Sequence, residues 1–488
     1  MRNITSMLYR GKSEYPRLML WHLMFMFILL QLSVAFLTNS SAFTIDEAML
    51  QYIGRNWFRH HLIPYTGGVD NKSPLAFAIF GLSDKLFGVN LWFPRLLGII
   101  AQSTGLYFVY KIANQFAGKQ AGFIAISLYG FSMLWHSTGG KFVSYTESYS
   151  ITLIIIAFYY YFNAAKYKDH FISGALAGLG FGFRVSAFFG LIAIFITLLR
   201  KNRISALYFS IGVLTSIILL AIIGYAAGIN LHDFITYGFS ENFGSGSTTD
   251  HTLLWRAEAF FNGFFYSELI LFYPAVIGYM LIKKRIDTLT TWLICEFAGV
   301  NIIGTYSFVH FKDLLPALSL MSTFLIIFLI KKHKISFKYV MLIIWITFFP
   351  KLLEPLVSAK NLLFPKNQKS ALIAENVETG RKKLGLWIKS NTTQKDQVLV
   401  AGFGAQVQAY SERLSASIYF NVTQTTKAKE YFFNEITLHK PAMILIPQGA
   451  GYNQFVQYDI RHFIDQLASE SYYFDRSLFG YSIYRIKI

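Results

Sequence analysis

The sequence predicts a polytopic α-helical membrane protein that ends in a small soluble α/β domain. Of its 488 residues, 54% are hydrophobic and only 14% are charged, and the mean hydropathy is +0.41. A soluble domain carries about 25% charged residues, so this chain has too few charges to cover a water-facing surface of its size. Long apolar stretches, basic residues in every second connection and a more polar C-terminal part are the three observations behind this fold class.

The apolar stretches approach the roughly 20 residues that a membrane-spanning helix needs. The first precedes no small-residue cleavage site, which favours a retained anchor over a cleaved signal peptide. The segment 75–88 contains Asp84 and Lys85 in its interior, and an interfacial helix is predicted there instead of a span. The eleven predicted spans are 18–38, 91–110, 120–135, 149–164, 171–183, 185–199, 204–228, 264–282, 288–305, 314–330 and 338–355.

The basic residues orient these spans, because Lys and Arg gather in cytoplasmic connections. They occur in every second connection, for example at Lys166 and Lys168 and again at Lys283, Lys284 and Arg285. The N-terminus is therefore predicted to be cytoplasmic, and the odd number of spans places the C-terminal part outside the cytoplasm. This pattern accounts for the net charge of +18, so no binding of nucleic acid is predicted.

The chain is predicted to have two domains, a membrane domain at 1–360 with a long first outer loop at 39–90, and a soluble domain at 366–488. The second domain holds 15 of the 44 basic and 10 of the 26 acidic residues. Its pattern alternates helices and strands, which predicts a small α/β fold. The predicted elements are helix 371–390, strand 397–401, helix 427–438, strand 442–446, helix 459–469 and a final strand or hairpin at 472–487.

No metal or nucleotide site is predicted. The single cysteine, Cys295, excludes an intrachain disulfide and a cysteine-based zinc site. His60 and His61 are adjacent, so on a helix they point about 100° apart, which is poor spacing for joint ligation. After the first predicted C-terminal strand, Gly402 and Gly404 lack the third glycine of a dinucleotide fingerprint.

Four charged residues stand out because they occur on the predicted outer side, next to the ends of spans. Asp46 and Glu147 each begin a helical pattern, where an acid suits the helix dipole or could take a proton from an incoming hydroxyl group. Lys72 and Arg184 could reach toward lipid headgroups or bind a leaving phosphate. Charges are expensive at a membrane boundary, so a set of four on one side favours a functional interpretation.

Three further residues are candidates for substrate contacts. Glu47 follows Asp46 directly. His310 and Lys312 lie with Asp313 in a polar turn after the ninth predicted span, which could be an interfacial turn or could contact phosphate or sugar. Glu296, in the middle of a predicted span, is interpreted as a structural acid bonded to a partner.

These motifs resemble those of the GT-C membrane glycosyltransferases, in particular the protein O-mannosyltransferases and the lipid A aminoarabinose transferase. The resemblance covers about 40–350 and is densest at 44–200. The first outer loop carries an Asp-Glu pair, a helix, a Lys-x-Pro turn and an apolar helix that ends in Leu-Phe-Gly. The residues that match are Asp46-Glu47, Lys72-Ser73-Pro74, Leu86-Phe87-Gly88 with Trp92 and Arg95, then Tyr145-Thr146-Glu147, GLGFGFR at 178–184 and the turn at 310–316.

The resemblance implies an inverting transferase that moves a monosaccharide from a polyprenyl-phosphate donor to an extracytoplasmic lipid, glycan or protein acceptor, in a bacterial inner membrane. It implies that Asp46 is the general base, that Glu147 orients the sugar or the acceptor, and that Lys72 and Arg184 bind the donor phosphate. No cofactor is expected, and dependence on a divalent metal is left open. Asn71 stands where the aminoarabinose enzymes have an acid, so their metal site is not expected here.

A transporter and a receptor-like scaffold are the alternatives to a glycosyltransferase. A transporter or flippase needs polar residues near the membrane midplane and often has repeated halves, whereas Glu296 is the single midplane candidate here. A receptor-like scaffold leaves the outer charges unexplained. The sequence therefore favours the glycosyltransferase.

Overall fold

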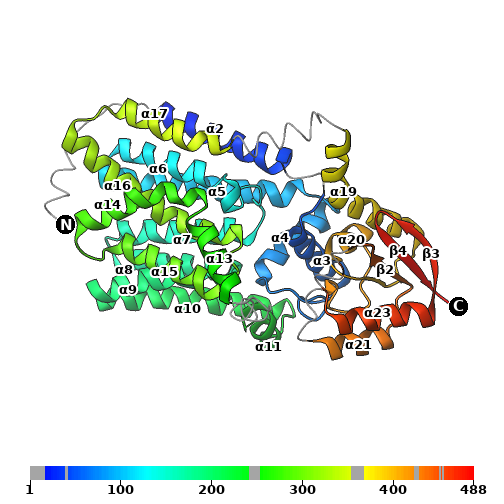
Figure 1. Ribbon diagram of the computed structural model, residues 1–488. Coiled ribbons are helices and arrows are strands. Elements are labelled where there is room, and N and C mark those ends of the chain that lie inside the picture. The colour runs from blue at the N-terminus through cyan, green and yellow to red at the C-terminus, as the bar shows by residue number, and fades with distance from the viewer. Residues whose placement is uncertain are drawn as a thin grey trace. The chain divides into compact units, whose positions relative to one another are not determined.

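The computed structural model shown in Figure 1 describes residues 17–38, 42–240, 253–352, 368–422, 428–449, 452 and 456–487. The chain divides into two compact units. The first unit comprises Met1–Asn39, Arg95–Ala226 and Phe239–Leu363, and the second comprises Ser40–Pro94, Ala227–Gly238 and Phe364–Ile488. The second unit thus groups the first outer loop with the C-terminal part. The predicted boundary at 360–366 lies outside the described residues, and the division into 1–360 and 366–488 stays a prediction.

Every regular element in the described part of the first unit is a helix. Short 3₁₀ or π segments join or extend its longer helices. The elements are α2 (Arg17–Ser33), η1 (Val34–Thr38), α5 (Trp92–Ala117), α6 (Lys119–Ser132), η2 (His136–Thr138), α7 (Thr146–Asn163), α8 (Tyr167–Phe183), α9 (Ala187–Lys201), α10 (Arg203–Ala226), α13 (Leu253–Phe264), η4 (Glu268–Phe272), α14 (Tyr273–Lys283), α15 (Thr288–Ile303), η5 (Phe308–Leu314), α16 (Leu315–His333), α17 (Phe337–Phe348) and η6 (Phe349–Leu352).

Several of these helices are long and apolar enough to cross a membrane, as expected of an integral membrane protein. Among the described residues, four helices pass on length and composition, and a fifth passes if the bent pair of α13 with η4 and α14 counts as one span. The two halves of that pair meet at 51°. The four are Leu18–Leu37, Trp92–Ala117, Arg203–Ala226 and Phe308–His333. The count of eleven spans stays a prediction, because most of the other helices are shorter.

Small residues allow α8 and α10 to pack with their backbones close together. A Cβ atom on Gly174 would lie 2.0 Å from the carbonyl oxygen of Phe209, and one on Gly212 would lie 2.1 Å from that of Phe171. The hydroxyl of Ser216 donates a hydrogen bond of 2.8 Å to the carbonyl of Ala175. Close approach at small residues is how membrane helices gain packing energy without a hydrophobic driving force.

The second unit combines two helices of the first outer loop with an α/β fold. A four-stranded sheet has the order β1-β2-β4-β3; β1 and β2 are parallel, and the final hairpin is antiparallel. The predicted C-terminal strands and helices are found within about three residues of their predicted bounds, while α20 was not predicted. The elements are α3 (Ile45–His60), α4 (Pro74–Phe87), α11 (Leu231–Asp233), η3 (Phe234–Ser240), α19 (Gln368–Asn391), β1 (Val398–Val400), α20 (Ala405–Ser411), α21 (Lys429–Leu438), β2 (Met443–Pro447), α23 (Tyr458–Ser471), β3 (Tyr472–Leu478) and β4 (Tyr481–Ile486).

Helices cover both faces of the sheet at β1 and β2, whose alternate residues point in opposite directions. Val398 and Val400 pack with Leu384 of α19 and Val407 of α20. On the other face, Leu399 and its neighbours on β2 pack with residues of α21 and α23. These layers account for the continuous apolar runs of β1 and β2 in the sequence.

We predict that Gly174→Ala destabilises the membrane unit, because the added methyl group meets the backbone of α10 rather than a movable side chain. A loss of about 2 kcal/mol is expected from overpacking of this kind. Thermal unfolding of the purified chain in detergent measures it. The matched control is Gly180→Ala on the same helix, where the nearest atoms to an added Cβ are 3.4 Å away or more. Equal melting temperatures for the two variants would contradict the proposed role of close helix packing.

Candidate functional site

The predicted site residues fall into two clusters, one within each compact unit. Asp46 and Lys72 belong to the second unit, and Glu147 and Arg184 belong to the first. The sequence analysis treats these four residues as one set; in the structure Lys72 lies beside Asp46, and Arg184 lies beside Glu147. The two clusters are described separately.

In the second unit, a capping box fixes the start of α3 and divides the roles of its two acids. The side chain of Thr44 accepts from the backbone N–H of Glu47, and the carboxylate of Glu47 accepts from the backbone N–H of Thr44 at 3.0 Å. Glu47 is 1% exposed, so its carboxylate serves the helix terminus. Asp46, one residue earlier, projects away from this cap, and its side chain is 37% exposed.

Lys72 lies between two carboxylates. Its Nζ is 3.1 Å from Oδ1 of Asp46 and 3.4 Å from Oδ1 of Asp70. The buried hydroxyl of Tyr65 donates to the carbonyl of Lys72 at 2.7 Å, and Pro74 is the first residue of α4. The backbone around Lys72 is therefore fixed on both sides, which holds the ammonium group next to Asp46.

Asp70 is a member of this cluster that the sequence analysis missed. It is fully buried, and its Oδ2 has no hydrogen-bond partner among the described residues. Burial raises the pKa of Asp70 above its usual value, while the positive charge of Lys72 opposes that increase. An acid two positions before a lysine in the same loop was the available signal, but nothing in the sequence indicated that it would be buried.

Helix α20 of the C-terminal part holds the segment that carries Asp46. The backbone N–H of Phe43 donates to the hydroxyl of Tyr410 at 2.9 Å, and the side-chain amide of Gln406 donates to the carbonyl of Phe43. Further along α3, the buried Arg55 donates to the carbonyl of Ala409 at 2.8 Å. Both backbone polar groups of Phe43, which directly precedes the N-cap Thr44, are thus bonded to α20.

Asp84, whose charge favoured an interfacial helix over a span at 75–88, has a structural role. Asp84 is buried in α4 and accepts a hydrogen bond of 2.6 Å from the side-chain amide of Gln51. It also pairs with Arg59, at 2.5 Å. These contacts join α3 to α4, and they explain why an otherwise apolar helix keeps a carboxylate in its interior.

In the first unit, Arg184 joins three separate segments. It follows the last residue of α8, and its Nη1 donates to both carboxylate oxygens of Asp313, at 2.9 and 2.7 Å. Its Nη2 lies 3.4 Å from Oε1 of Glu147, which begins α7. The Nη2 group is buried and makes no hydrogen bond within the described part of the chain. Asp313, which the sequence analysis grouped with His310 and Lys312 without a separate role, is the main partner of Arg184.

The helix η5 presents three different faces because a 3₁₀ helix repeats every three residues. His310 and Asp313 share one face, and Lys312 lies on the next. Lys312 is 3% exposed, its Nζ donates to the carbonyl of Phe142 at 3.3 Å, and it interacts electrostatically with Glu147 and Asp313. His310 interacts electrostatically with Glu147. Both predicted residues therefore belong to the Arg184 cluster.

One other residue singled out in the sequence can be placed. Glu296 is buried in α15 and accepts a hydrogen bond of 3.1 Å from the indole of Trp292, which is the partner-bonded arrangement expected from the sequence. Among the described residues, no group of three or more His, Cys, Asp or Glu side chains is arranged to hold a metal ion.

The fold is similar to those of ArnT and of an oligosaccharyltransferase. ArnT from Cupriavidus metallidurans bound to undecaprenyl phosphate has a TM-score of 0.62 at 13% identity, covering 94% of this chain and 97% of that chain. Its apo structure has a TM-score of 0.63 at 12% identity, covering 96% and 98%. The Archaeoglobus fulgidus oligosaccharyltransferase in complex with Zn and sulfate has a TM-score of 0.54 at 13% identity, covering 95% of this chain and 73% of that chain.

One segment of the sequence matches a known family. Residues 71–225 match the family described as dolichyl-phosphate-mannose-protein mannosyltransferase. This match covers less than half of the chain. The matched segment contains Lys72, Glu147 and Arg184, while Asp46 precedes it. No curated protein matches the chain in sequence.

We predict that Asp313→Asn lowers the unfolding free energy of the protein by about 3 kcal/mol, because it removes one partner of a buried ion pair and leaves the guanidinium group with the more distant Glu147. Thermal or denaturant unfolding in detergent measures the change. The control is Asp459→Asn, which breaks the exposed pair of Asp459 with Lys429 at 2.8 Å and should cost much less, because water and salt screen an exposed pair. Equal costs would show that the Arg184 pair is not a structural anchor.

We also predict an opposite pH dependence for two carboxylates. Burial raises the pKa of Asp70, so the folded state binds its proton more tightly than the unfolded state does. Its favourable contribution is complete below the unfolded pKa of about 3.9 and is lost as pH rises through the folded pKa. Asp70→Asn should therefore gain stability relative to the wild type as pH rises.

The control for this prediction is Asp475→Asn in the C-terminal hairpin. The hydrogen bond from Arg485 lowers the pKa of Asp475, so its contribution appears above the unfolded pKa and is lost as pH falls through the folded value. The melting temperature of this variant should fall behind that of the wild type as pH rises. A pH-independent difference between wild type and Asp70→Asn would contradict the assignment for Asp70.

Proposed function

We propose that this protein is a glycosyltransferase that moves a monosaccharide from a polyprenyl-phosphate donor to a hydroxyl group of an extracytoplasmic lipid, glycan or protein acceptor, with inversion at the anomeric carbon. The observation that carries the proposal is the arrangement around Asp46. Of the three acids in its cluster, Glu47 is occupied by the helix cap and Asp70 is fully buried, whereas Asp46 is partly exposed beside a lysine. A fixed, accessible carboxylate is what a general base requires.

In the proposed step, Asp46 takes the proton of the acceptor hydroxyl as the hydroxyl oxygen attacks the anomeric carbon. The bond from that carbon to the phosphate oxygen breaks, and the polyprenyl phosphate leaves with the electron pair. Attack from the side opposite the leaving group inverts the anomeric centre. The products are the glycosylated acceptor, the polyprenyl phosphate and the protonated carboxyl group of Asp46.

The leaving phosphate gains charge, and we propose that Lys72 and Arg184 stabilise it. Fixed cations aimed at developing charge are usually a large part of catalysis. The buried Nη2 of Arg184, which makes no hydrogen bond within the described residues, supports this role because a phosphate oxygen could accept from it. One structure of similar fold is bound to undecaprenyl phosphate, and we propose a ligand of the same class for this chain.

The remaining candidates have narrower roles in this proposal. Glu147 orients the sugar or the acceptor and shares Arg184 with Asp313. Lys312 and His310 contact the phosphate or the sugar, which their position in the Arg184 cluster supports. Glu47 was a candidate for substrate contacts, but its burial and its bonds to Thr44 support a capping role. We further propose a cytoplasmic N-terminus, with the reaction on the opposite side of the membrane.

We predict that Asp46→Asn lowers turnover by about 10²- to 10⁴-fold, the usual contribution of a general base, with little change in the donor KM. The measurement is release of polyprenyl phosphate and transfer of labelled sugar, using the full chain in liposomes, a panel of polyprenyl-phosphate sugars and acceptor-containing membrane extract. Asp459→Asn, an exposed acid in the C-terminal part, is the matched control. Equal turnover of the Asp46 variant and the wild type would reject Asp46 as the base. If the wild type transfers no sugar from any donor in the panel, the proposed function itself is wrong.

A further inference from the structure

A cavity of about 670 Å³ opens on the first unit beside η5. Its walls come from the segment at His136, from α13, from η4, from the loop before η5 and from Lys351 of η6. Ligand sites in proteins have volumes of roughly 300–1,000 Å³, so this cavity is large enough to hold a substrate group. None of the residues to which a role has been assigned above lines it.

The cavity and the Arg184 cluster share one short helix. Phe308 and Phe311 lie three residues apart on η5 and line the cavity, whereas the face with His310 and Asp313 belongs to the Arg184 cluster. Thr305, another lining residue, lies 3.1 Å from Nδ1 of His310. A ligand in the cavity would therefore lie directly beside the cluster proposed to bind the donor phosphate.

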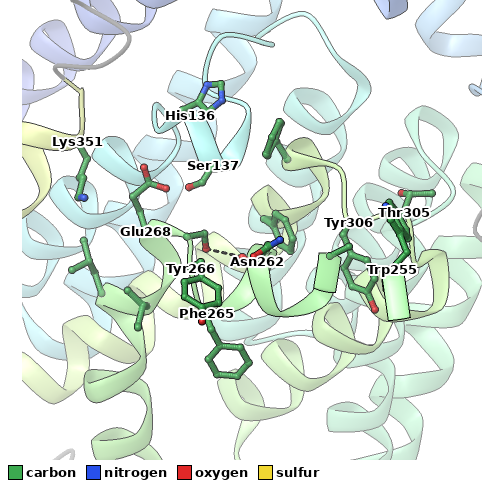
Figure 2. Close-up of a pocket in the computed structure, with 17 residues that line it drawn as sticks. His136, Ser137, Trp255, Asn262, Phe265, Tyr266, Glu268, Thr305, Tyr306 and Lys351 are labelled. Carbon is green, nitrogen blue, oxygen red and sulfur yellow. Dashed lines mark hydrogen bonds between the residues drawn. The ribbon is translucent and has the colours of Figure 1, made fainter. Parts of the chain in front are cut away.

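The cavity combines aromatic faces with polar groups of mixed character. Figure 2 shows His136, Ser137, Glu268 and Lys351 at one end, Trp255, Thr305 and Tyr306 at the other, and Asn262 with Tyr266 between them. Among the described residues, the side chains of Asn262 and Glu268 have no hydrogen-bond or ion-pair partner within the protein. The lining therefore offers both donors and acceptors together with apolar faces.

This combination distinguishes between classes of ligand. The carboxylate of Glu268 would repel a phosphate group. The basic side chains in the lining are Lys351 and His136, so the cavity lacks the excess of positive charge found in an anion site. A hydrocarbon chain would cover Asn262 and Glu268 without replacing their hydrogen bonds to water, which is costly. A neutral sugar fits both the polar groups and the aromatic faces of the lining. Each of its hydroxyls donates and accepts hydrogen bonds, and its C–H faces stack on aromatic rings.

We propose that this cavity binds a neutral carbohydrate ring of the acceptor, with Glu268 and Asn262 bonded to its hydroxyls and Trp255 or Tyr266 stacked on its face. The inference rests on the proposed function, because it names the acceptor as a glycan or glycolipid. It places the acceptor sugar beside the Arg184 cluster, on the neighbouring face of η5.

The first test measures binding directly and needs no transfer activity. The full chain in nanodiscs is titrated with methyl glycosides of common hexoses and N-acetylhexosamines, and binding is followed by saturation-transfer NMR. Octyl tetraethylene glycol ether serves as a probe with a tail but no sugar. At least one glycoside should bind saturably, and Glu268→Gln and Asn262→Leu should each weaken it about tenfold, the effect of losing one good hydrogen bond. Glu258→Gln, an exposed acid on α13 outside the cavity lining, should have no effect.

Three results of the binding test would overturn the inference. These are the absence of binding for every glycoside, binding that neither cavity variant changes, and binding in the cavity of the sugar-free ether alone. The last result would identify a groove for lipid tails.

A transfer assay with the same variants separates this inference from the proposed function. The acceptor KM should rise about tenfold in both cavity variants, while the donor KM stays unchanged. If the wild type transfers sugar and the variants keep its acceptor KM, the cavity does not bind the acceptor and the inference is wrong, although the proposed function stands. If the wild type shows no transfer but binds glycosides in the cavity, the cavity's preference for carbohydrate is upheld and the proposed function fails.

Discussion

The ion pairs of Arg184 are the interaction on which the membrane unit's site depends. A buried guanidinium group holds Asp313 through two hydrogen bonds and lies near Glu147, so one side chain joins the start of α7, the end of α8 and the helix η5. Charges buried near a membrane are costly unless they are paired. The pairing therefore sets the rotation of η5, and that rotation places Phe308 and Phe311 on the wall of the neighbouring cavity.

Much of the architecture could be predicted from the sequence because the relevant signals are local. Apolar stretches, the continuous apolar runs at β1 and β2 and the Pro74 turn each depend on residues within one element. The pairs of Arg184 with Asp313 and of Phe43 with Tyr410 are different, since their members lie 129 and 367 residues apart. Composition and spacing carry no signal for such contacts, so Asp313 received no role of its own and α20 was missed.

The two acids at the start of α3 show why residue type alone does not decide function. Asp46 and Glu47 are adjacent and chemically alike, and the resemblance to known transferases covers both. The phase of the helix separates them, because the capping box turns Glu47 inward and leaves Asp46 facing Lys72. Asp70 makes the same point. It is a carboxylic acid in the same loop as Lys72, but it is completely buried, so its environment differs from that of Asp46.

The hydrogen bonds from Tyr410 and Gln406 to Phe43 have a consequence for biosynthesis. A ribosome adds about 5–20 residues per second, and 367 residues separate Phe43 from Tyr410, so the Asp46 segment is made roughly 20 to 70 seconds before its anchor exists. Until then the backbone before the capping box lacks two of its partners. A chain that stops short of residue 406 can insert its helices and still leave the start of α3 unanchored. The last part to be translated thus completes the support of a segment that is among the first to be made.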